Sequence, residues 1–219
     1  MKGRMGLFGG TFDPVHCGHL QAAREVRTAF SLDKVLLIPS FTPPHKERAG
    51  MVPAADRLRM VELACAGEPG FEASSIEVDA GEKSYSIITL EKIRRIYPLS
   101  RVFFILGIDA FLEIDTWRDH ERVLEECHFI VMTRPGFRFE DAGRVLGGAL
   151  RGRIHRVSGA GTIDESLFES PRIFFTPIRA MDVSSTEVRR RIRAGESVRG
   201  LVPDPVDEYI RTRHLYREA

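Results

Sequence analysis

The sequence predicts an α/β fold: a doubly wound, mainly parallel sheet with helices on both faces and a small helical part at the C-terminal end. Several short runs along the chain are almost entirely apolar, as strands of a parallel sheet are when both faces are covered. Helix-like patterns separate most of these runs, and such alternation is typical of parallel sheets. Two further helix patterns close the chain after the final apolar run.

Glycines and prolines bound most of the apolar runs and mark where strands end. The segment 39–52 holds three prolines and a glycine, so we expect a loop there, and residues 136–171 show no clear pattern. We expect strands at residues 6–10, 34–38, 71–78, 101–106, 129–132 and 173–175.

Apolar side chains recur at helical spacing between the expected strands. We expect helices at residues 19–30, 54–66, 86–97, 121–126, 184–194 and 205–214. The expected buried faces are Leu20, Ala23, Val26 and Phe30 in the first helix, Leu58, Val61, Leu63 and Ala64 in the second, and Ile87, Leu90, Ile93 and Ile96 in the third.

Composition narrows the class of protein. A chain of 219 residues can bury a full core within one domain. Its 32 basic and 31 acidic side chains leave a formal charge of +1, which argues against non-specific nucleic-acid binding. Cys17, Cys65 and Cys127 form no C-x-x-C pair, so they predict no disulfide framework and fit a reducing cytoplasm. The apolar run near the amino terminus is too short for a signal peptide or a membrane span.

The first expected strand runs into the string GGTFDPVHCGH, residues 9–19, with two histidines three apart where a helix begins. A helix start offers unpaired N–H groups and the positive end of the helix dipole, which suit phosphate, and imidazoles there can donate to phosphate oxygens. A lone histidine near a helix cap would more often be structural, but the combined string favours a phosphate site. Neither G-x-x-x-x-G-K-[ST] nor G-x-G-x-x-G occurs.

Two further segments place polar groups at positions suited to anions. Ser184 and Glu187 are spaced as a capping box, and a capped helix start with spare hydroxyls within reach of Arg189 is also an anion site. Lys46 lies in the proline-rich loop beyond an expected strand, where ligands bind in parallel sheets. Arg57 at the start of the next helix is a weaker candidate for the same contact.

The string at residues 9–19 resembles the H-x-G-H signature of the nucleotidylyltransferase superfamily, and in its longer form that of bacterial nicotinate mononucleotide adenylyltransferases. The resemblance covers nearly the whole chain and implies a Rossmann-like fold. The further segments that match, in order, are Pro43–Lys46, Ser84–Ser86 with Thr89 and Leu90, Gly107–Asp109, Trp117, Arg134–Gly136, Val183–Thr186 with Arg189, and Val202–Pro203 with Val206, Tyr209 and Ile210.

The resemblance implies roles for particular residues. As catalytic residues it implies His16, His19, Lys46 and Arg189, with His19 closest to the transferring phosphorus. As ATP-binding residues it implies Gly9, Gly10, Thr11, Phe12, His16, His19, Gly107, Asp109, Arg134, Ser185, Thr186 and Arg189. As pyridine-nucleotide-binding residues it implies Lys46, Tyr85, Ser86, Asp109, Trp117 and Arg118, with Trp117 stacked on the ring and backbone N–H groups near Ser86 and Arg118 holding the nicotinate carboxylate.

The reaction that the resemblance implies joins AMP from ATP to nicotinate mononucleotide, giving deamido-NAD and pyrophosphate in NAD biosynthesis. The acceptor phosphate, with a second pKa near ~6, is already anionic at neutral pH, so direct in-line attack needs no covalent enzyme intermediate. We expect Mg²⁺ on the ATP phosphates, held by substrate and water with no metal ligand from the protein.

Three alternatives stay open on the sequence alone. Another member of the superfamily, such as a phosphopantetheine adenylyltransferase or a cytidylyltransferase, would share H-x-G-H but is not expected to carry the Pro43–Lys46 loop, Trp117 and the Ser84–Leu90 segment together. A non-catalytic nucleotide-binding module is a second class, because a fold does not fix a function. A fragment of a tRNA-charging enzyme is a third, although the chain has no K-M-S-K-S string and is not basic.

We expect one continuous domain, with residues 1–183 as the nucleotide-binding core and residues 184–219 as a C-terminal helical segment that completes the ATP site. ATP and nicotinate mononucleotide are the expected partners, with no nucleic acid and no membrane. Whether the chain forms a homo-oligomer stays open, as does its choice between acid and amide mononucleotides. The segment 157–172 is longer than the family leads us to expect and could be a surface loop or an oligomer contact.

Overall fold

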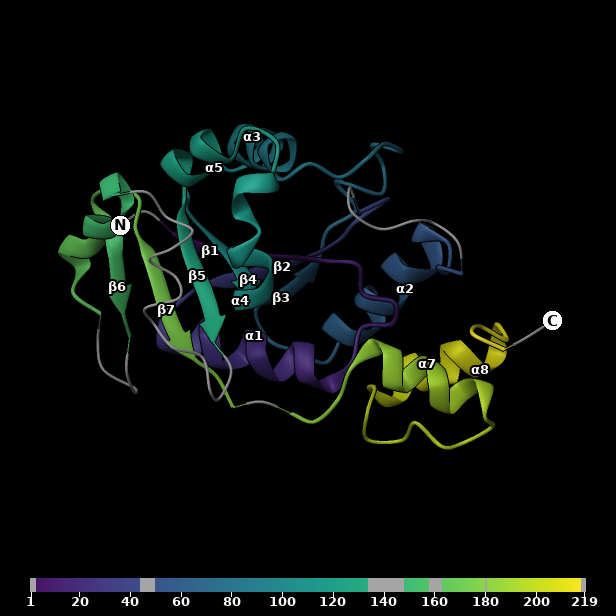
Figure 1. The fold of residues 1–219 in the computed structure, drawn as a ribbon. Helices are drawn as coiled ribbons and strands as arrows, with labels where there is room; N and C mark the ends of the chain where they lie inside the picture. The colour runs from purple at the N-terminus through teal and green to yellow at the C-terminus, as the bar shows by residue number, and fades with distance from the viewer. Residues whose placement is uncertain (1–2, 44–49, 134–147, 158–162, 180, 218–219) are drawn as a thin grey trace.

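The computed structural model describes residues 3–43, 50–133, 148–157, 163–179 and 181–217, and within them one sheet forms the centre of the molecule (Figure 1). Its strand pairs are all parallel, in the order β3-β2-β1-β4-β5-β7-β6. The strands are β1 (Arg4–Gly10), β2 (Lys34–Pro39), β3 (Phe71–Ala73), β4 (Arg101–Gly107), β5 (His128–Thr133), β6 (Ile154–Arg156) and β7 (Ile173–Pro177).

This strand order confirms the predicted doubly wound α/β fold. The chain builds outward from β1 through β2 to β3, and then returns to the other side of β1 with β4. The order therefore reverses between β1 and β4. In open α/β sheets ligands bind beyond the carboxyl ends of the strands at such a switch point, so the residues that follow Gly10 and Gly107 are the first place to look for a site.

Helices cover both faces of the sheet, and the last two helices form the C-terminal end of the described chain. Figure 1 shows α3 and α5 on one face and α1 on the other, with α8 beside α2. The helices are α1 (Cys17–Ala29), α2 (Ala54–Cys65), α3 (Ser86–Ile96), α4 (Ile108–Leu112), α5 (His120–Glu126), α7 (Ser185–Arg193) and α8 (Asp204–Thr212), with short 3-10 turns at Ile114–Thr116, Gly148–Arg153 and Glu165–Phe168.

Each face of the sheet carries its own apolar core. On one side Leu20, Ala23 and Val26 of α1 pack with α2, α7 and α8, and on the other Ile87, Leu90 and Ile93 of α3 pack with α4 and α5. Because successive side chains of a strand point to opposite faces, almost every residue of β4 and β5 is buried. The predicted buried face of the first helix is confirmed, including Phe30 just after it.

Three predictions about the elements are wrong. The strand predicted at residues 71–78 ends at Ala73, because its partner β2 reaches Pro39, which has no N–H with which to continue the ladder. Ile96 is 59% exposed: at 3.6 residues per turn, steps of three residues drift round the helix, and Ile96 lies opposite Ile87. Leu58 and Leu63 are only half-buried, and Met60 fills the core instead.

Part of the long segment near residues 157–172 packs into the fold. Phe168 is 2% exposed and meets Phe103 and His128 edge-on, with ring centroids 5.3 Å and 5.6 Å away. The described end of the segment is thus a cover over one end of the sheet rather than a free surface loop. The neighbouring edge strand β6 was not predicted, since its three residues form no apolar run.

Candidate functional site

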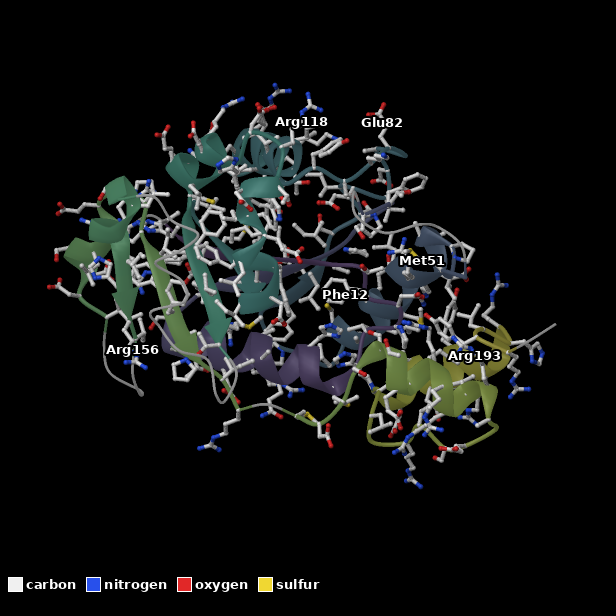
Figure 2. All side chains as sticks on the ribbon, in the orientation of Figure 1. Phe12, Met51, Glu82, Arg118, Arg156 and Arg193 are labelled. Carbon is white, nitrogen blue, oxygen red and sulfur yellow. The ribbon has the colours of Figure 1, made fainter. Side chains whose placement is uncertain are left out.

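The two histidines lie where the sequence predicts them, at a helix start beyond the carboxyl end of β1. His16 is the N-cap residue of α1, which begins at Cys17 rather than at His19, and His19 occupies its third position. Their rings stack with centroids 3.6 Å apart. Phe12 of the preceding loop is 2% exposed and meets the His19 ring edge-on at 5.0 Å, and Figure 2 shows Phe12 between the sheet and the C-terminal helices.

The hydrogen bonding of His19 fixes which of its nitrogens carries the proton. The backbone N–H of His16 donates to Nδ1 of His19 at 3.2 Å, so a neutral His19 ring carries its proton on Nε2 and can donate from there. Burial lowers the pKa of His16 to about 4. Burial and the neighbouring His16 lower the pKa of His19 well below its usual value. Both rings are therefore neutral at pH 7, and each can donate one hydrogen bond.

Glycines near the histidine pair have two uses: one allows close packing, and two leave open space beside the backbone. A Cβ on Gly18 would lie 2.9 Å from Cγ1 of Val183 and 3.2 Å from Nδ1 of His16, so a side chain between the histidines would push the His16 ring or the chain before α7. A Cβ on Gly9 or Gly107 would meet no described atom within 4 Å. Gly9 is the next-to-last residue of β1 and Gly107 is the last residue of β4, so both lie near the switch point, where the backbone can be approached closely.

Helix α7 begins against the loop that joins β1 to α1. Ser184 caps the helix, its Oγ accepting from the N–H of Glu187 at 3.2 Å. Ser185 Oγ donates to the carbonyl of Pro14 at 2.9 Å, and Arg189 Nη1 donates to the carbonyl of Asp13 at 2.7 Å. The predicted Ser184 cap is confirmed. The Glu187 side chain does not take the part that a capping box gives it; its carboxylate accepts from Arg190 and Arg191 at the helix surface instead.

Thr186 completes this end of the helix. Arg189 Nη2 donates to Thr186 Oγ1 at 3.4 Å, so the two side chains lie together beside the loop. The structure thus brings Ser185, Thr186 and Arg189 to the loop that carries Thr11, Phe12 and the histidines. Segments far apart in the sequence therefore meet at one place, beyond the carboxyl end of β1.

The weaker phosphate candidate, Arg57, has a structural role instead. Its side chain is 1% exposed and binds four backbone carbonyls. Nε donates to Val52 at 3.0 Å, Nη1 to Thr11 and Ser40 at 2.7 Å each, and Nη2 to Phe41 at 2.9 Å. Since every nitrogen of the guanidinium is used, Arg57 is not available to a phosphate; it ties the end of β1 to the end of β2.

A second group of predicted residues gathers at the start of α3. Tyr85 is the N-cap of α3 and Ser86 its first residue, so this helix start presents N–H groups that have no partner within the helix. The guanidinium of Arg118 lies 5.1 Å from the centre of the Tyr85 ring. Trp117 is half-buried and meets Phe104 of β4 edge-on at 5.8 Å. Tyr85, Ser86 and Arg118 are thus brought together, on the α3–α5 side where Figure 2 labels Arg118.

Asp109 follows β4 as predicted and lies in the first turn of α4, whose N-cap is Gly107. Lys46 and Arg134, the remaining candidates, lie outside the described residues.

In the part of the chain that is described, no group of three or more His, Cys, Asp or Glu side chains is placed to hold a metal ion. No described helix is long and apolar enough to cross a membrane.

Sequence reasoning missed two polar groups beside these clusters, the buried Asp13 and the half-buried Glu77. Asp13, inside the motif, is 7% exposed and accepts from the Tyr216 hydroxyl at 2.8 Å. Glu77 accepts from Thr89 Oγ1 at 2.6 Å, and burial raises the pKa of Glu77. The sequence pattern does not distinguish Asp13 from other loop residues, because its partner Tyr216 lies 203 positions away along the chain.

Cys17, between the two histidines, is expected to tolerate replacement. Its backbone N–H donates to the Leu201 carbonyl at 2.8 Å, a contact that any residue but proline makes, and burial raises the pKa of its thiol, so it is a weak nucleophile. We expect the Cys17→Ser and Cys17→Ala proteins to keep turnover within about twofold of the parent. Loss of turnover in an assay independent of thiols would contradict this.

A doubly wound parallel sheet with a histidine pair at a helix start beyond its switch point defines a nucleotide-binding α/β protein. The cytidylyltransferase-like family model matches residues 7–191, and the chain belongs to that family.

Curated relatives match along almost the whole chain. A protein of Desulfatibacillum aliphaticivorans named "Probable nicotinate-nucleotide adenylyltransferase" is 44% identical over 217 residues, which cover 97% of this chain and 99% of that protein. A protein of Moorella thermoacetica with the same name is 42% identical, covering 98% and 92%. The solved Plasmodium falciparum nicotinic acid mononucleotide adenylyltransferase complexed with NaAD has a TM-score of 0.69 at 16% identity, covering 98% and 97%, a likeness that shows the fold alone.

Proposed function

We propose that this protein is a nicotinate-nucleotide adenylyltransferase, which transfers AMP from ATP to nicotinate mononucleotide and releases pyrophosphate. One observation carries the proposal: the His16–His19 pair and Arg189 converge on a single loop at the switch point of the sheet. Relatives of that name, 38–44% identical over nearly the full length, support this reaction over those of other proteins that carry H-x-G-H.

The ATP phosphates would lie against the start of α1, at the positive end of its dipole. His16 and His19 would donate to phosphate oxygens, with His19 acting from Nε2 nearest the transferring phosphorus. Arg189 would add positive charge from α7, with Ser185 and Thr186 beside it. We further propose that residues 184–219 complete this site as part of one continuous domain, and that Lys46 and Arg134 contact the nucleotides.

The pyridine nucleotide would lie on the α3 side, between the ends of β2 and β4. Trp117 would stack on the pyridine ring, and N–H groups near Ser86 and Arg118 would bind the carboxylate. Tyr85 would line the same pocket, and Asp109 would accept from ribose hydroxyls. These contacts would select the acid over the amide, since hydrogen bonds to a charged acceptor are about twice as strong as neutral ones.

The transfer itself would depend on aligning the two substrates and stabilising negative charge, and less on a general acid or base. The acceptor phosphate attacks the α-phosphorus of ATP in line, the bond to the β-phosphate oxygen breaks, and pyrophosphate leaves with the electron pair. Neutral imidazoles in a water-poor site can strengthen their hydrogen bonds as charge gathers on the transferring group. Magnesium would enter as the ATP complex, with its ligands supplied by phosphates and water. We place the reaction in the cytoplasm, and a homo-oligomer is compatible with it.

The test is one assay of purified protein with MgATP and a choice of acceptors, read by pyrophosphate release and by mass spectrometry of the dinucleotide. We expect deamido-NAD from nicotinate mononucleotide, with kcat/KM at least about tenfold above that for the amide, the ratio that ~1.4 kcal/mol of selective binding gives. Chelating the magnesium should stop turnover. Phosphopantetheine with ATP, and CTP as the donor, are the controls. Pyrophosphate release with either control but not with nicotinate mononucleotide would reject the proposal.

A further inference from the structure

The carboxylate of Asp13 is a buried junction between three distant parts of the chain. Its Oδ1 accepts from the Tyr216 hydroxyl at 2.8 Å and from the Val52 N–H at 3.4 Å. Its Oδ2 lies 3.8 Å from Nη1 of Arg189, the same nitrogen that donates to the Asp13 carbonyl. Contacts from the C-terminal end, from the segment before α2 and from α7 therefore meet on the residue three positions before His16.

The loop that carries Asp13 has a conformation that needs outside support. Phe12 has φ of 49°, a left-handed value that costs an L-residue with a bulky side chain stability. Side chains from elsewhere also hold the loop carbonyls, Arg57 at Thr11 and Ser185 at Pro14. The loop is thus set by its surroundings, and those surroundings also set where His16 and the start of α1 lie.

Tyr216 reaches this loop from the turn after α8. The N–H of Leu215 donates to the Ile210 carbonyl at 3.0 Å, and Tyr216 has φ of 64°, so the chain folds back on the helix and points the ring inward. Burial and the Asp13 carboxylate raise the pKa of Tyr216, so the hydroxyl stays protonated and donates across the neutral range. The Tyr216 hydroxyl donates and the Asp13 carboxylate oxygen accepts, so the two groups are matched.

We propose that Tyr216 is a positioning residue for the ATP site: its hydroxyl, bound to buried Asp13, locks the Phe12–His16 loop in the shape that presents the two histidines. This inference rests on the proposed function for its catalytic consequence, whereas the effect on the loop does not depend on it. Tyr216 does not contact the reacting groups in this view; it acts through Asp13.

The test replaces Tyr216 by phenylalanine, which keeps the ring and removes the hydroxyl. We expect backbone amides at residues 11–13, 15 and 16 to exchange hydrogen about tenfold faster, as loss of one hydrogen bond to a charged group allows. With the active enzyme we expect kcat/KM for ATP to fall about tenfold as well, with KM for the mononucleotide changed less than about twofold.

The matched control is Tyr209→Phe. Tyr209 is also half-buried, and its hydroxyl donates to a carboxylate, Oδ1 of Asp56, at 2.8 Å, but this bond joins α8 to α2 away from the loop. The Tyr209→Phe variant should leave hydrogen exchange in the loop and kcat/KM for ATP unchanged. Equal effects of the two variants, or unchanged exchange in Tyr216→Phe, would overturn the proposal. If the parent protein transfers no AMP, the proposed function fails, while loop exchange still decides the role of Tyr216.

Discussion

Replacing His19 by alanine is expected to lower kcat by ~10²–10³, the usual scale for losing one preorganised donor to a developing charge. The imidazole is neutral in the free protein, and the His16 N–H directs its proton to Nε2. Its contribution grows as charge builds on the oxygens of the transferring group, so the loss should fall on turnover. KM for the pyridine nucleotide, whose proposed site lies near Tyr85 and Trp117, should change little. Steady-state kinetics with each substrate varied in turn measures both.

Two further variants separate this role from damage to the fold. His19→Asn keeps an acceptor for the His16 N–H but has no ring, so it should fold like the parent and still lose turnover. His155→Ala removes an imidazole from β6 at the far edge of the sheet and should leave kcat within about twofold. An unchanged kcat in His19→Ala would reject the assigned role, and a loss restored by asparagine would mean that only the helix start matters.

Replacing Arg57 by methionine is expected to lower the free energy of unfolding by ~4 kcal/mol. Methionine fills a similar volume but leaves the carbonyls of Thr11, Ser40, Phe41 and Val52 without their donor. Each buried carbonyl left unpaired costs ~1–3 kcal/mol, and water or small shifts can relieve part of the sum. Because folded proteins are stable by only ~5–15 kcal/mol, this is a large share of the total. Urea denaturation gives the value.

Arg59→Met is the matched control on the same helix. Arg59 is exposed and pairs with Glu62 one turn away at 2.8 Å, a contact worth ~0.2–0.5 kcal/mol. Arg57→Lys should lie between the two, because an ammonium has three donors and cannot span four carbonyls. Similar losses for Arg57→Met and Arg59→Met would show that the four carbonyl contacts do not stabilise the fold.

Local sequence patterns predicted which helices and strands exist better than they predicted where each one begins and ends. Strands such as Arg101–Gly107 are apolar runs because both faces are buried, and this signal is contained in the segment itself. β3 and β6 depend on partners instead: the one stops where Pro39 ends the ladder, and the other forms because Ile154, His155 and Arg156 lie beside β7. Strand order, the basis for locating the site, is likewise a property of the whole sheet.

The same distinction applies to the site. The histidine pair and the cap at Ser184 were predictable, because neighbours a few residues away create them. Arg57 was only a weaker candidate for phosphate, from its place at the start of a helix, and its real environment consists of backbone carbonyls from three separate segments. The Asp13–Tyr216 pair joins residues 203 positions apart, and a pattern read along the chain contains no sign of it.

That separation has a consequence for how the protein is made. Translation delivers β1, the loop and both histidines early, and domains begin to organise from the N-terminal side as the chain emerges. Val52 reaches Asp13 soon afterwards, but Arg189 and Tyr216 arrive only after most of the polypeptide has been synthesised. A nascent chain can therefore complete its sheet while its nucleotide pocket is still unfinished. On the ribosome, the sheet forms before the protein is able to bind its nucleotides.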